Sequence, residues 1–173
     1  MSASDTQLLV DFLAADAHGL PGRLGLTSAP GRFRPGLDPA SDRLLQDDLA
    51  WLRHHHGASV LVTLLEDALA WLRHHHGASV LVTLLEEIEL LRYGIHGLRR
   101  AARRAGLESL WMPTPDMSVP PSFEETQSLV GTVVERMTAG RTVVIHCLAG
   151  RGRSGTVAAC CLVACGRVAA DGG

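Results

Sequence analysis

Short, nearly continuous apolar runs predict the strands of this protein. A strand buried on both faces has such a run, which is typical of a parallel sheet between layers of helices. The runs cover residues 58–65, 107–112 and 142–146, and residues 22–28 are a candidate first strand that the turn Pro30-Gly31 ends. We therefore expect an α/β fold with a central, mostly parallel sheet flanked by helices.

Apolar residues spaced three and four positions apart predict the helices. One helix is expected from Ser41 to about Gly57, and a second series continues at Ile88, Leu91, Ile95 and Leu98. Ser122 and Glu125 form a capping box, so another helix begins there and ends at Gly140. Its expected core positions are Leu129, Val130, Val133, Val134 and Met137. The apolar run from Val157 to Cys165 is long enough for a last helix.

One stretch of sequence occurs twice. Residues 49–66 and 69–86 both read LAWLRHHHGASVLVTLLE, which is one duplicated helix–strand unit. We expect the second copy to supply the sheet strand, because it leads directly into Glu87 and the following helices. The first copy then extends the preceding helix or forms a loop, and the alternative is that both strands enter the sheet.

Composition and charge narrow the class of protein. The chain has 173 residues, 46% of them hydrophobic and 20% charged, as expected for one globular domain. A net charge of −2 argues against a nucleic-acid partner. No apolar run is long enough to span a bilayer, and no basic residue precedes the opening Leu8-Leu9-Val10, so neither a membrane association nor a signal peptide is expected.

The cysteines indicate a reducing compartment. Cys147, Cys160, Cys161 and Cys165 lie close together without the spacing of a disulfide framework, and we expect a cytoplasmic protein. The triplets His54-His55-His56 and His74-His75-His76 do not predict a metal site. Consecutive residues on a helix point in different directions and cannot converge on one ion.

The segment from Thr142 to Thr156 carries the candidate chemistry. A strand, a glycine-containing loop and a helix N-terminus together present backbone N–H groups to a phosphate. Gly150 and Gly152 allow the loop amides to approach an anion closely. Arg153 offers a planar guanidinium for two phosphate oxygens, and Cys147 lies where the helix N-terminus and this guanidinium favour the thiolate.

The pattern His146-Cys147-x-x-Gly150-x-x-Arg153-Ser154 resembles the signature of cysteine-dependent protein tyrosine and dual-specificity phosphatases. The alternative is a buried cysteine before a helix, with the glycine loop only as a turn. The wider order of motifs resembles the atypical dual-specificity phosphatases, especially the kinase-associated phosphatase group and its bacterial relatives. On this resemblance we expect residues 1–18 to be an N-terminal lead-in, loose or in a short helix, and residues 19–173 to form one phosphatase-like domain. Relatives continue with further helices, so we expect a C-terminally truncated domain.

Asp116 is the candidate general acid. It lies in a proline-rich loop, 31 residues before Cys147 (147 minus 116), and it is the only acidic residue between Glu108 and Glu124. Phosphatases of the resembled family carry their general acid on such a loop. The alternative is an aspartate that only forms a turn after Pro115.

The resemblance implies a mechanism without a metal or cofactor. Cys147 would attack phosphorus and form a cysteinyl-phosphate, and Asp116 would protonate the leaving oxygen and later activate water. Ser154 would hydrogen-bond the sulfur, and His146 would help to fix the loop. The expected phosphate-binding residues are Leu148, Ala149, Gly150, Arg151, Gly152 and Arg153.

The resemblance implies a phosphorylated protein as substrate, with phosphotyrosine first and phosphoserine or phosphothreonine also open. An inactive phosphate-binding module is a second hypothesis. A phosphatase acting on a phosphoinositide or an RNA 5′-phosphate is a third. The sequence does not predict the oligomeric state.

Overall fold

The described residues form a single mixed sheet between two layers of helices. The computed structural model describes residues 8–30 and 58–166. Within these ranges the strand order is β1-β2-β5-β3-β4. The strands are β1 (Val10–Phe12), β2 (Arg23–Thr27), β3 (Ala78–Thr83), β4 (Glu108–Trp111) and β5 (Thr142–His146). Only the β1–β2 pairing is antiparallel, so the predicted α/β fold with a mostly parallel sheet is confirmed.

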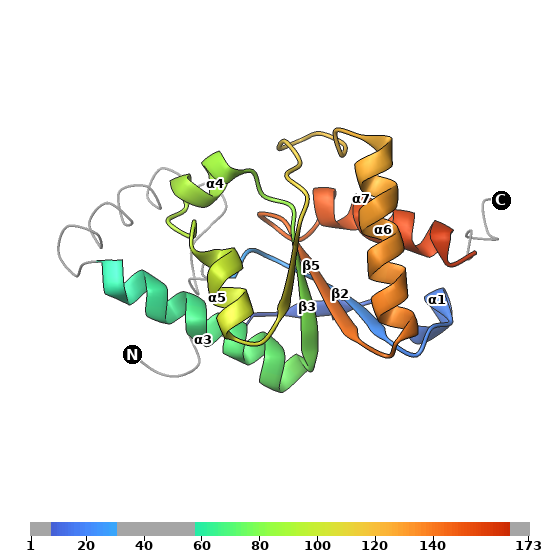
Figure 1. The fold of residues 1–173 in the computed structure, drawn as a ribbon, viewed down its shortest axis with the longest axis horizontal. Coiled ribbons are helices and arrows are strands. Elements are labelled where there is room, and N and C mark those ends of the chain that lie inside the picture. Colours follow the sequence, from blue (N-terminus) through green and yellow to red (C-terminus); the bar gives the residue numbers. More distant parts are fainter. Residues whose placement is uncertain (1–7, 31–57, 167–173) are drawn as a thin grey trace.

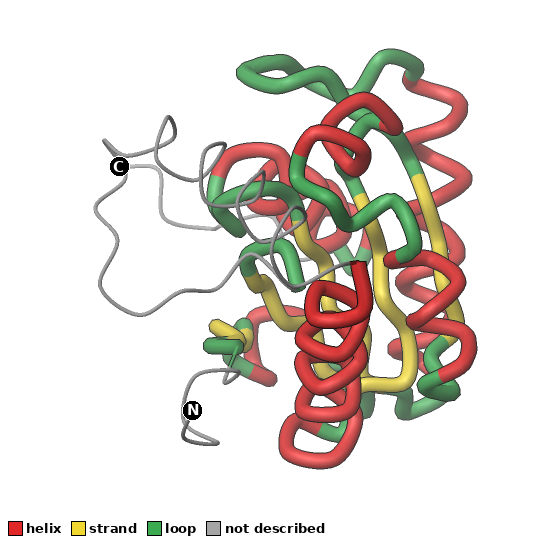
Figure 2. The backbone as a smooth tube through the Cα atoms, turned by 90° about the vertical axis from the view of Figure 1, so that its left-hand side faces the viewer, coloured by secondary structure: helices red, strands yellow, loops and turns green. Residues whose placement is uncertain are grey.

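Helices cover both faces of this sheet (Figures 1 and 2). The helices are α1 (Ala15–His18), α3 (Ala58–His76), α4 (Glu87–Arg92), α5 (Leu98–Arg104), α6 (Phe123–Thr138) and α7 (Gly152–Ala164). On one face, Leu81 and Val144 pack with α3 and α5. On the other face, Val82, Val143 and Ile145 pack with α6 and α7. This alternation explains why the strands read as continuous apolar runs. None of the helices in the described ranges has the length and apolar character to cross a membrane.

The two copies of the repeated sequence adopt different secondary structures. Ala78–Thr83 of the second copy forms the central strand β3. In the first copy, the same ASVLVT text at residues 58–63 is helical and begins α3, which continues through the second copy to His76. The expectation that the second copy supplies the sheet strand is therefore confirmed, whereas the apolar run at residues 58–65 does not form a strand. The second copy fills the strand position next to β5. In the first copy, the tertiary surroundings override the β propensity of the same sequence.

The amino end of the chain contains a strand that the sequence pattern did not predict. β1 pairs with β2 from Val10↔Thr27 to Phe12↔Gly25 and extends the sheet by one antiparallel strand. Gly25 makes this close approach possible, because a Cβ there would lie 2.5 Å from a Val10 methyl group. The helix predicted from Ser41 to Gly57 lies outside the described residues.

The region after β3 forms two short helices separated by a turn. Ile88 and Leu91, which continue the predicted apolar series, are 68% and 49% exposed. The other two members of that series, Ile95 and Leu98, are buried as expected, and Leu90 is the buried residue of α4. The helix after Ser122 follows its prediction more closely. The Ser122 hydroxyl accepts from the Glu125 N–H at 3.2 Å, and α6 buries four of its five expected core residues, Leu129, Val130, Val133 and Met137.

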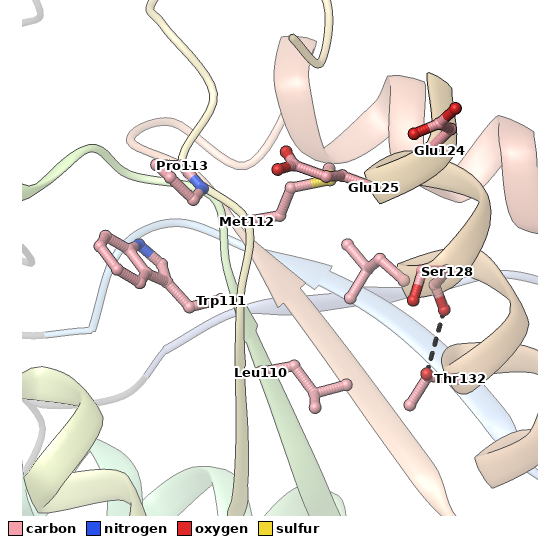
Figure 3. A pocket seen from close by; sticks show the side chains of 9 residues that line it. Leu110, Trp111, Met112, Pro113, Glu124, Glu125, Ser128 and Thr132 are labelled. Carbon is pink, nitrogen blue, oxygen red and sulfur yellow. Dashed lines mark hydrogen bonds between the residues drawn. The ribbon is translucent and has the colours of Figure 1, made fainter. Parts of the chain in front are cut away.

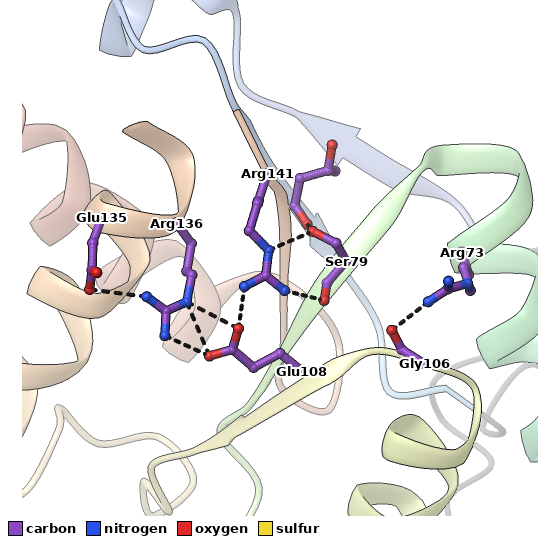
Figure 4. Close-up of polar contacts among 8 residues, drawn as sticks. Arg73, Ser79, Gly106, Glu108, Glu135, Arg136 and Arg141 are labelled. Carbon is purple, nitrogen blue, oxygen red and sulfur yellow. Dashed lines mark hydrogen bonds and ion pairs between the residues drawn. The ribbon is translucent and has the colours of Figure 1, made fainter. Parts of the chain in front are cut away.

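An ion-pair network joins the amino ends of the strands (Figure 4). Glu108, at the start of β4, accepts from Arg136 of α6 at 3.0 and 3.1 Å and also from Arg141, just before β5. Arg141 also donates to the Ser79 carbonyl of β3 at 3.0 Å. The Arg136 hydrogen bonds, against an opposing effect of burial, lower the pKa of Glu108, and Arg141 acts in the same direction. The network fixes this end of the sheet, opposite the carboxyl ends where ligands bind in open α/β sheets.

Candidate active site

The cysteine loop begins at the carboxyl end of β5. Sheet register places Thr27, His146 and Thr83 side by side across β2, β5 and β3, and Cys147 follows immediately. The loop lies close to the end of β2, because the Ala29 N–H donates to the Leu148 carbonyl at 3.2 Å. Gly150 has a φ of 73°, and a Cβ there would lie 2.6 Å from the Thr27 carbonyl. Only glycine therefore fits this turn without displacing β2.

The Cys147 sulfur is buried at the base of this loop. Its side chain is 3% exposed, and Sγ lies 3.4 Å from the Ser154 hydroxyl on the first turn of α7. Burial alone would raise the pKa of Cys147. The Ser154 hydroxyl and the backbone N–H groups of Ser154, Gly150 and Arg151 outweigh burial, so the pKa is lowered. Oriented donors at a helix N-terminus thus favour a thiolate at this position.

Arg153 connects α7 to two other parts of the site. It is 4% exposed and donates to both Glu89 carboxylate oxygens, at 2.7 and 2.9 Å. It also donates to the Thr114 carbonyl at 2.9 Å, and its Nη2 lies 3.2 Å from Asp116 Oδ1. The guanidinium is therefore held by planar, charge-assisted hydrogen bonds beside the cysteine loop.

The loop that carries Asp116 is anchored at Thr114. The Thr114 side chain is completely buried, its N–H donates to the Leu84 carbonyl at 3.0 Å, and its hydroxyl donates to the Met112 carbonyl at 3.2 Å. Asp116 itself is 62% exposed on its side chain. The next residue, Met117, has a φ of 55° and is 98% exposed. A fixed anchor thus precedes an open loop tip in which the carboxylate faces both Arg153 and solvent.

His146 supports the loop from inside the sheet. Burial lowers its pKa to about 4, and the Arg153 charge acts in the same direction, so the ring is neutral near pH 7. Its Nδ1 lies 3.2 Å from the Cys147 carbonyl and its Nε2 lies 2.9 Å from the Thr83 hydroxyl. Since a carbonyl only accepts, Nδ1–H donates to Cys147 and Nε2 accepts from Thr83. The second repeat copy therefore supplies a hydroxyl that fixes this tautomer.

The structure brings the residues predicted from sequence into one site. Cys147, Arg153, Ser154 and Asp116 are linked through the contacts above, and Arg151 and Gly150 contribute amides to the sulfur. Leu148 and Ala149 form the first turn of the loop, and Gly152 begins α7. Among the described residues, no group of three or more histidine, cysteine or acidic side chains is placed to hold a metal ion.

Glu89 is the site residue that the sequence analysis did not identify. It is the third residue of α4 and completes a capping box, since its Oε2 accepts from the Glu86 N–H at 2.9 Å. Glu86 takes the place that Ser or Thr has in the usual capping-box pattern, so the sequence did not single out this helix start. Nothing in the local sequence pointed to Arg153, which is 64 positions away in the chain.

Similar proteins share this fold and this local sequence. A structure of kinase-associated phosphatase with serine in place of its catalytic-site cysteine superposes with a TM-score of 0.69 at 18% identity, covering 91% of this chain and 74% of that one. That match shows the fold. The active form of Tk-PTP gives a TM-score of 0.50 at 32% identity, over 57% of this chain and 62% of that one.

Curated relatives match a shorter segment. Mouse laforin is 41% identical over 58 residues, which is 34% of this chain and 17% of laforin. Human phosphatidylglycerophosphatase and protein-tyrosine phosphatase 1 is 36% identical over 61 residues, 35% of this chain and 30% of the relative. The matched segments thus span less than a third of these relatives.

Fold, loop and relatives define a cysteine-dependent phosphatase of the protein tyrosine and dual-specificity superfamily. The family model described as "Polymorphic toxin system, DSP-PTPase phosphatase" matches residues 54–167, and the chain belongs to this family.

Proposed function

We propose that this phosphatase hydrolyses phosphotyrosine in proteins through a cysteinyl-phosphate, with phosphoserine and phosphothreonine as further substrates. What supports the proposal is that these groups converge: against the opposing effect of burial, the Ser154 hydroxyl and the amides of Ser154, Gly150 and Arg151 lower the pKa of Cys147, and Arg153 lies 3.2 Å from Asp116. A nucleophile, an oxyanion-binding cation and a proton donor are thereby within one site.

In the first step, the Cys147 thiolate attacks phosphorus and the bond from phosphorus to the tyrosine oxygen breaks. Asp116 gives its proton to that oxygen, so the leaving group departs as a neutral phenol. Arg153 and the amides of residues 148–153 bind the non-bridging oxygens, on which charge develops.

In the second step, water attacks the phosphorus of the cysteinyl-phosphate. Asp116 accepts a proton from this water, the phosphorus–sulfur bond breaks, and Cys147 leaves as a thiolate. Ser154 hydrogen-bonds the departing sulfur, for which its 3.4 Å separation is suitable. The products are inorganic phosphate and the regenerated thiolate. The reaction needs Cys147 reduced, which fits a cytoplasmic setting.

The proposal is tested with a phosphotyrosine peptide in the presence of a chelator. We expect metal-independent phosphate release, inhibition by vanadate, and a phosphorylated protein that can be trapped in a single turnover. Cys147→Ser should abolish both release and trapping. Turnover that survives this substitution would falsify the proposal, whereas binding without any trapped intermediate would favour an inactive phosphate-binding module.

A lipid phosphomonoester is a second candidate substrate. Two of the curated relatives are named as phosphatidylglycerophosphate phosphatases, at 36% and 39% identity over short segments. Comparing kcat/KM for phosphopeptides with that for phosphatidylglycerophosphate in mixed micelles separates the two candidates.

A further inference from the structure

A pocket lies beside the active site, between the edge strand β4 and helix α6 (Figure 3). Its volume is about 580 Å³, within the range of pockets that bind small ligands or side chains. Leu110, Met112 and Leu129 provide apolar surface, and Ser128 and Thr132 lie along α6. The Thr132 hydroxyl donates to the Ser128 carbonyl at 3.0 Å. None of the residues described above as the cysteine loop lines this pocket.

The pocket lies next to the stems of the loop that carries Asp116. Pro113, which lines it, immediately precedes Thr114, whose carbonyl accepts from Arg153 at 2.9 Å. Glu124 and Glu125, which also line it, follow the same loop on the first turn of α6. Since one extended residue spans about 3.3 Å, Pro113 at the edge of the pocket lies within roughly 10 Å of the Arg153 guanidinium. A peptide bound at Cys147 would therefore reach the pocket with a neighbouring residue.

The pocket is negatively charged. Glu124 and Glu125 are both exposed, and neither carboxylate has an ion-pair partner among the residues that the structure describes. None of the residues that line the pocket is basic. The helix N-terminus stabilises the two carboxylates without neutralising them. Their charges are therefore available to a cation that enters from outside.

We propose that this pocket binds a lysine or arginine side chain of the phosphorylated protein substrate. This inference rests on the proposed phosphatase function and names the substrate class: phosphotyrosine with a basic residue nearby. A long basic side chain fits both halves of the pocket, because its methylene stem packs on Leu110, Met112 and Leu129 while its charged group meets Glu124 and Glu125.

Exposed apolar side chains on the loop after Asp116 and at the start of α6 indicate that the ligand is a peptide and not an isolated cation. Met117, Val119 and Phe123 are 98%, 68% and 81% exposed, and they lie between Asp116 and Glu124 in the chain. Exposed apolar residues gathered in one segment are typical of an interaction surface. A bound segment that crosses this surface would cover them.

The test uses pairs of phosphotyrosine peptides. In one series a single lysine is moved through the positions on either side of the phosphotyrosine, and in the matched series glutamine replaces that lysine. The measurement is the lysine-to-glutamine ratio of kcat/KM, in wild type, in Glu124→Gln/Glu125→Gln, and in the charge-matched control Asp16→Asn/Asp67→Asn. The control aspartates are exposed on α1 and α3. Because the lysine-to-glutamine ratio is taken within each variant, a general loss of activity in a variant does not change it.

We expect wild type and control to prefer lysine at one position by about three- to tenfold, with the preference falling at high salt. In the glutamine double variant the ratio should return to about one. A ratio of one in wild type at every position, or a preference that the double variant keeps, overturns the inference. Hydrolysis of p-nitrophenyl phosphate by wild type tests the proposed function separately, because that substrate does not reach the pocket.

Discussion

Arg153 donates to both carboxylate oxygens of Glu89, at 2.7 and 2.9 Å, although the two residues are 64 positions apart in the chain. Both side chains are shielded from solvent, with exposures of 3% for Arg153 and 12% for Glu89. The start of α4 therefore orients the guanidinium of α7. Glu89 is a positioning residue in this arrangement, because it touches the arginine and the α4 backbone.

Glu89→Ala should lower the free energy of unfolding by about 3 kcal/mol, because it removes both carboxylate hydrogen bonds of the buried Arg153 and leaves only the Thr114 carbonyl and the exposed Asp116 as partners. It should also reduce kcat, since the Arg153 guanidinium is then oriented less firmly in the site. Urea unfolding and steady-state kinetics measure both effects. Glu87→Ala on the same helix is the control, because Glu87 is exposed. Equal effects of the two substitutions would contradict the positioning role.

Asp116→Asn should slow turnover by roughly 10²- to 10⁴-fold while substrate binding is largely retained. The loss should be larger for an alkyl phosphate than for p-nitrophenyl phosphate, because a poor leaving group depends more on the proton donor. Measuring kcat for the two substrates checks this. A similar loss for both would mean that another group supplies the proton.

Cys147 should react with iodoacetamide at lower pH than Cys161 and Cys165. Burial opposes ionisation of Cys147, but the Ser154 hydroxyl and the loop amides lower its pKa, whereas burial raises the pKa of Cys161 to about 12. Ser154→Ala should move the Cys147 midpoint to higher pH because it removes that hydroxyl. Peptide mass spectrometry after alkylation over a pH series measures each midpoint. An unchanged Cys147 midpoint in Ser154→Ala would show that the hydroxyl does not stabilise the thiolate.

The protein should lose stability as the pH falls through the window from 6.5 to 4. The pKa of His146 is lowered by burial from 6.5 to about 4 in the folded protein, so the unfolded chain binds the extra proton in this window. The His146 contribution is complete above pH 6.5, and about 3 kcal/mol of it is lost on acidification. Urea unfolding at several pH values measures the slope of the free energy of unfolding against pH. His146→Asn should flatten it, with the exposed His96→Asn as the control.

The sequence predicted the parts of the site that are local in the chain. The spacing from His146 to Ser154 was sufficient for the signature, because the strand, loop and helix that carry it are consecutive. Asp116 was a candidate because of its proline-rich loop and the resemblance to the family. Glu89 and Thr83 were not predicted, since their roles depend on sheet register and on where α4 lies relative to α7. Local spacing contains neither piece of information.

The strand predictions were correct where the apolar runs are long. They were wrong where contacts with the rest of the fold determine the secondary structure. The strands β3 and β5 have side chains buried on both sheet faces, which their runs reflect. The edge strand β4 is half-buried, and the buried residues of its run are Leu107 and Met112 on either side of it. β1 has only three residues, too short for a periodic pattern. The pattern at residues 58–65 is a genuine strand pattern, but the place it suits is already filled by β3.

Removal of one repeat should leave the fold and the active site intact. Deleting residues 49–68 retains β3, and it brings Leu45 to the position of Leu65 and Asp48 to that of the buried Ala68. Burying a carboxylate there should cost a few kcal/mol of stability, and Asp48→Ala in the shortened chain should restore it. Thermal unfolding and p-nitrophenyl phosphate hydrolysis measure both. Loss of activity in a folded shortened chain would contradict this prediction.

The repeat places identical residues in two environments within one molecule. Residues 58–66 and 78–86 have the same intrinsic propensities and the same composition, yet the first lie in a helix and most of the second in a strand. The chain diverges only afterwards, into Asp67-Ala68-Leu69 in one case and Glu87-Ile88-Glu89 in the other. Only the second continuation delivers the carboxylate that Arg153 binds. Glu89, which orients the Arg153 guanidinium, therefore follows only the copy that enters the sheet.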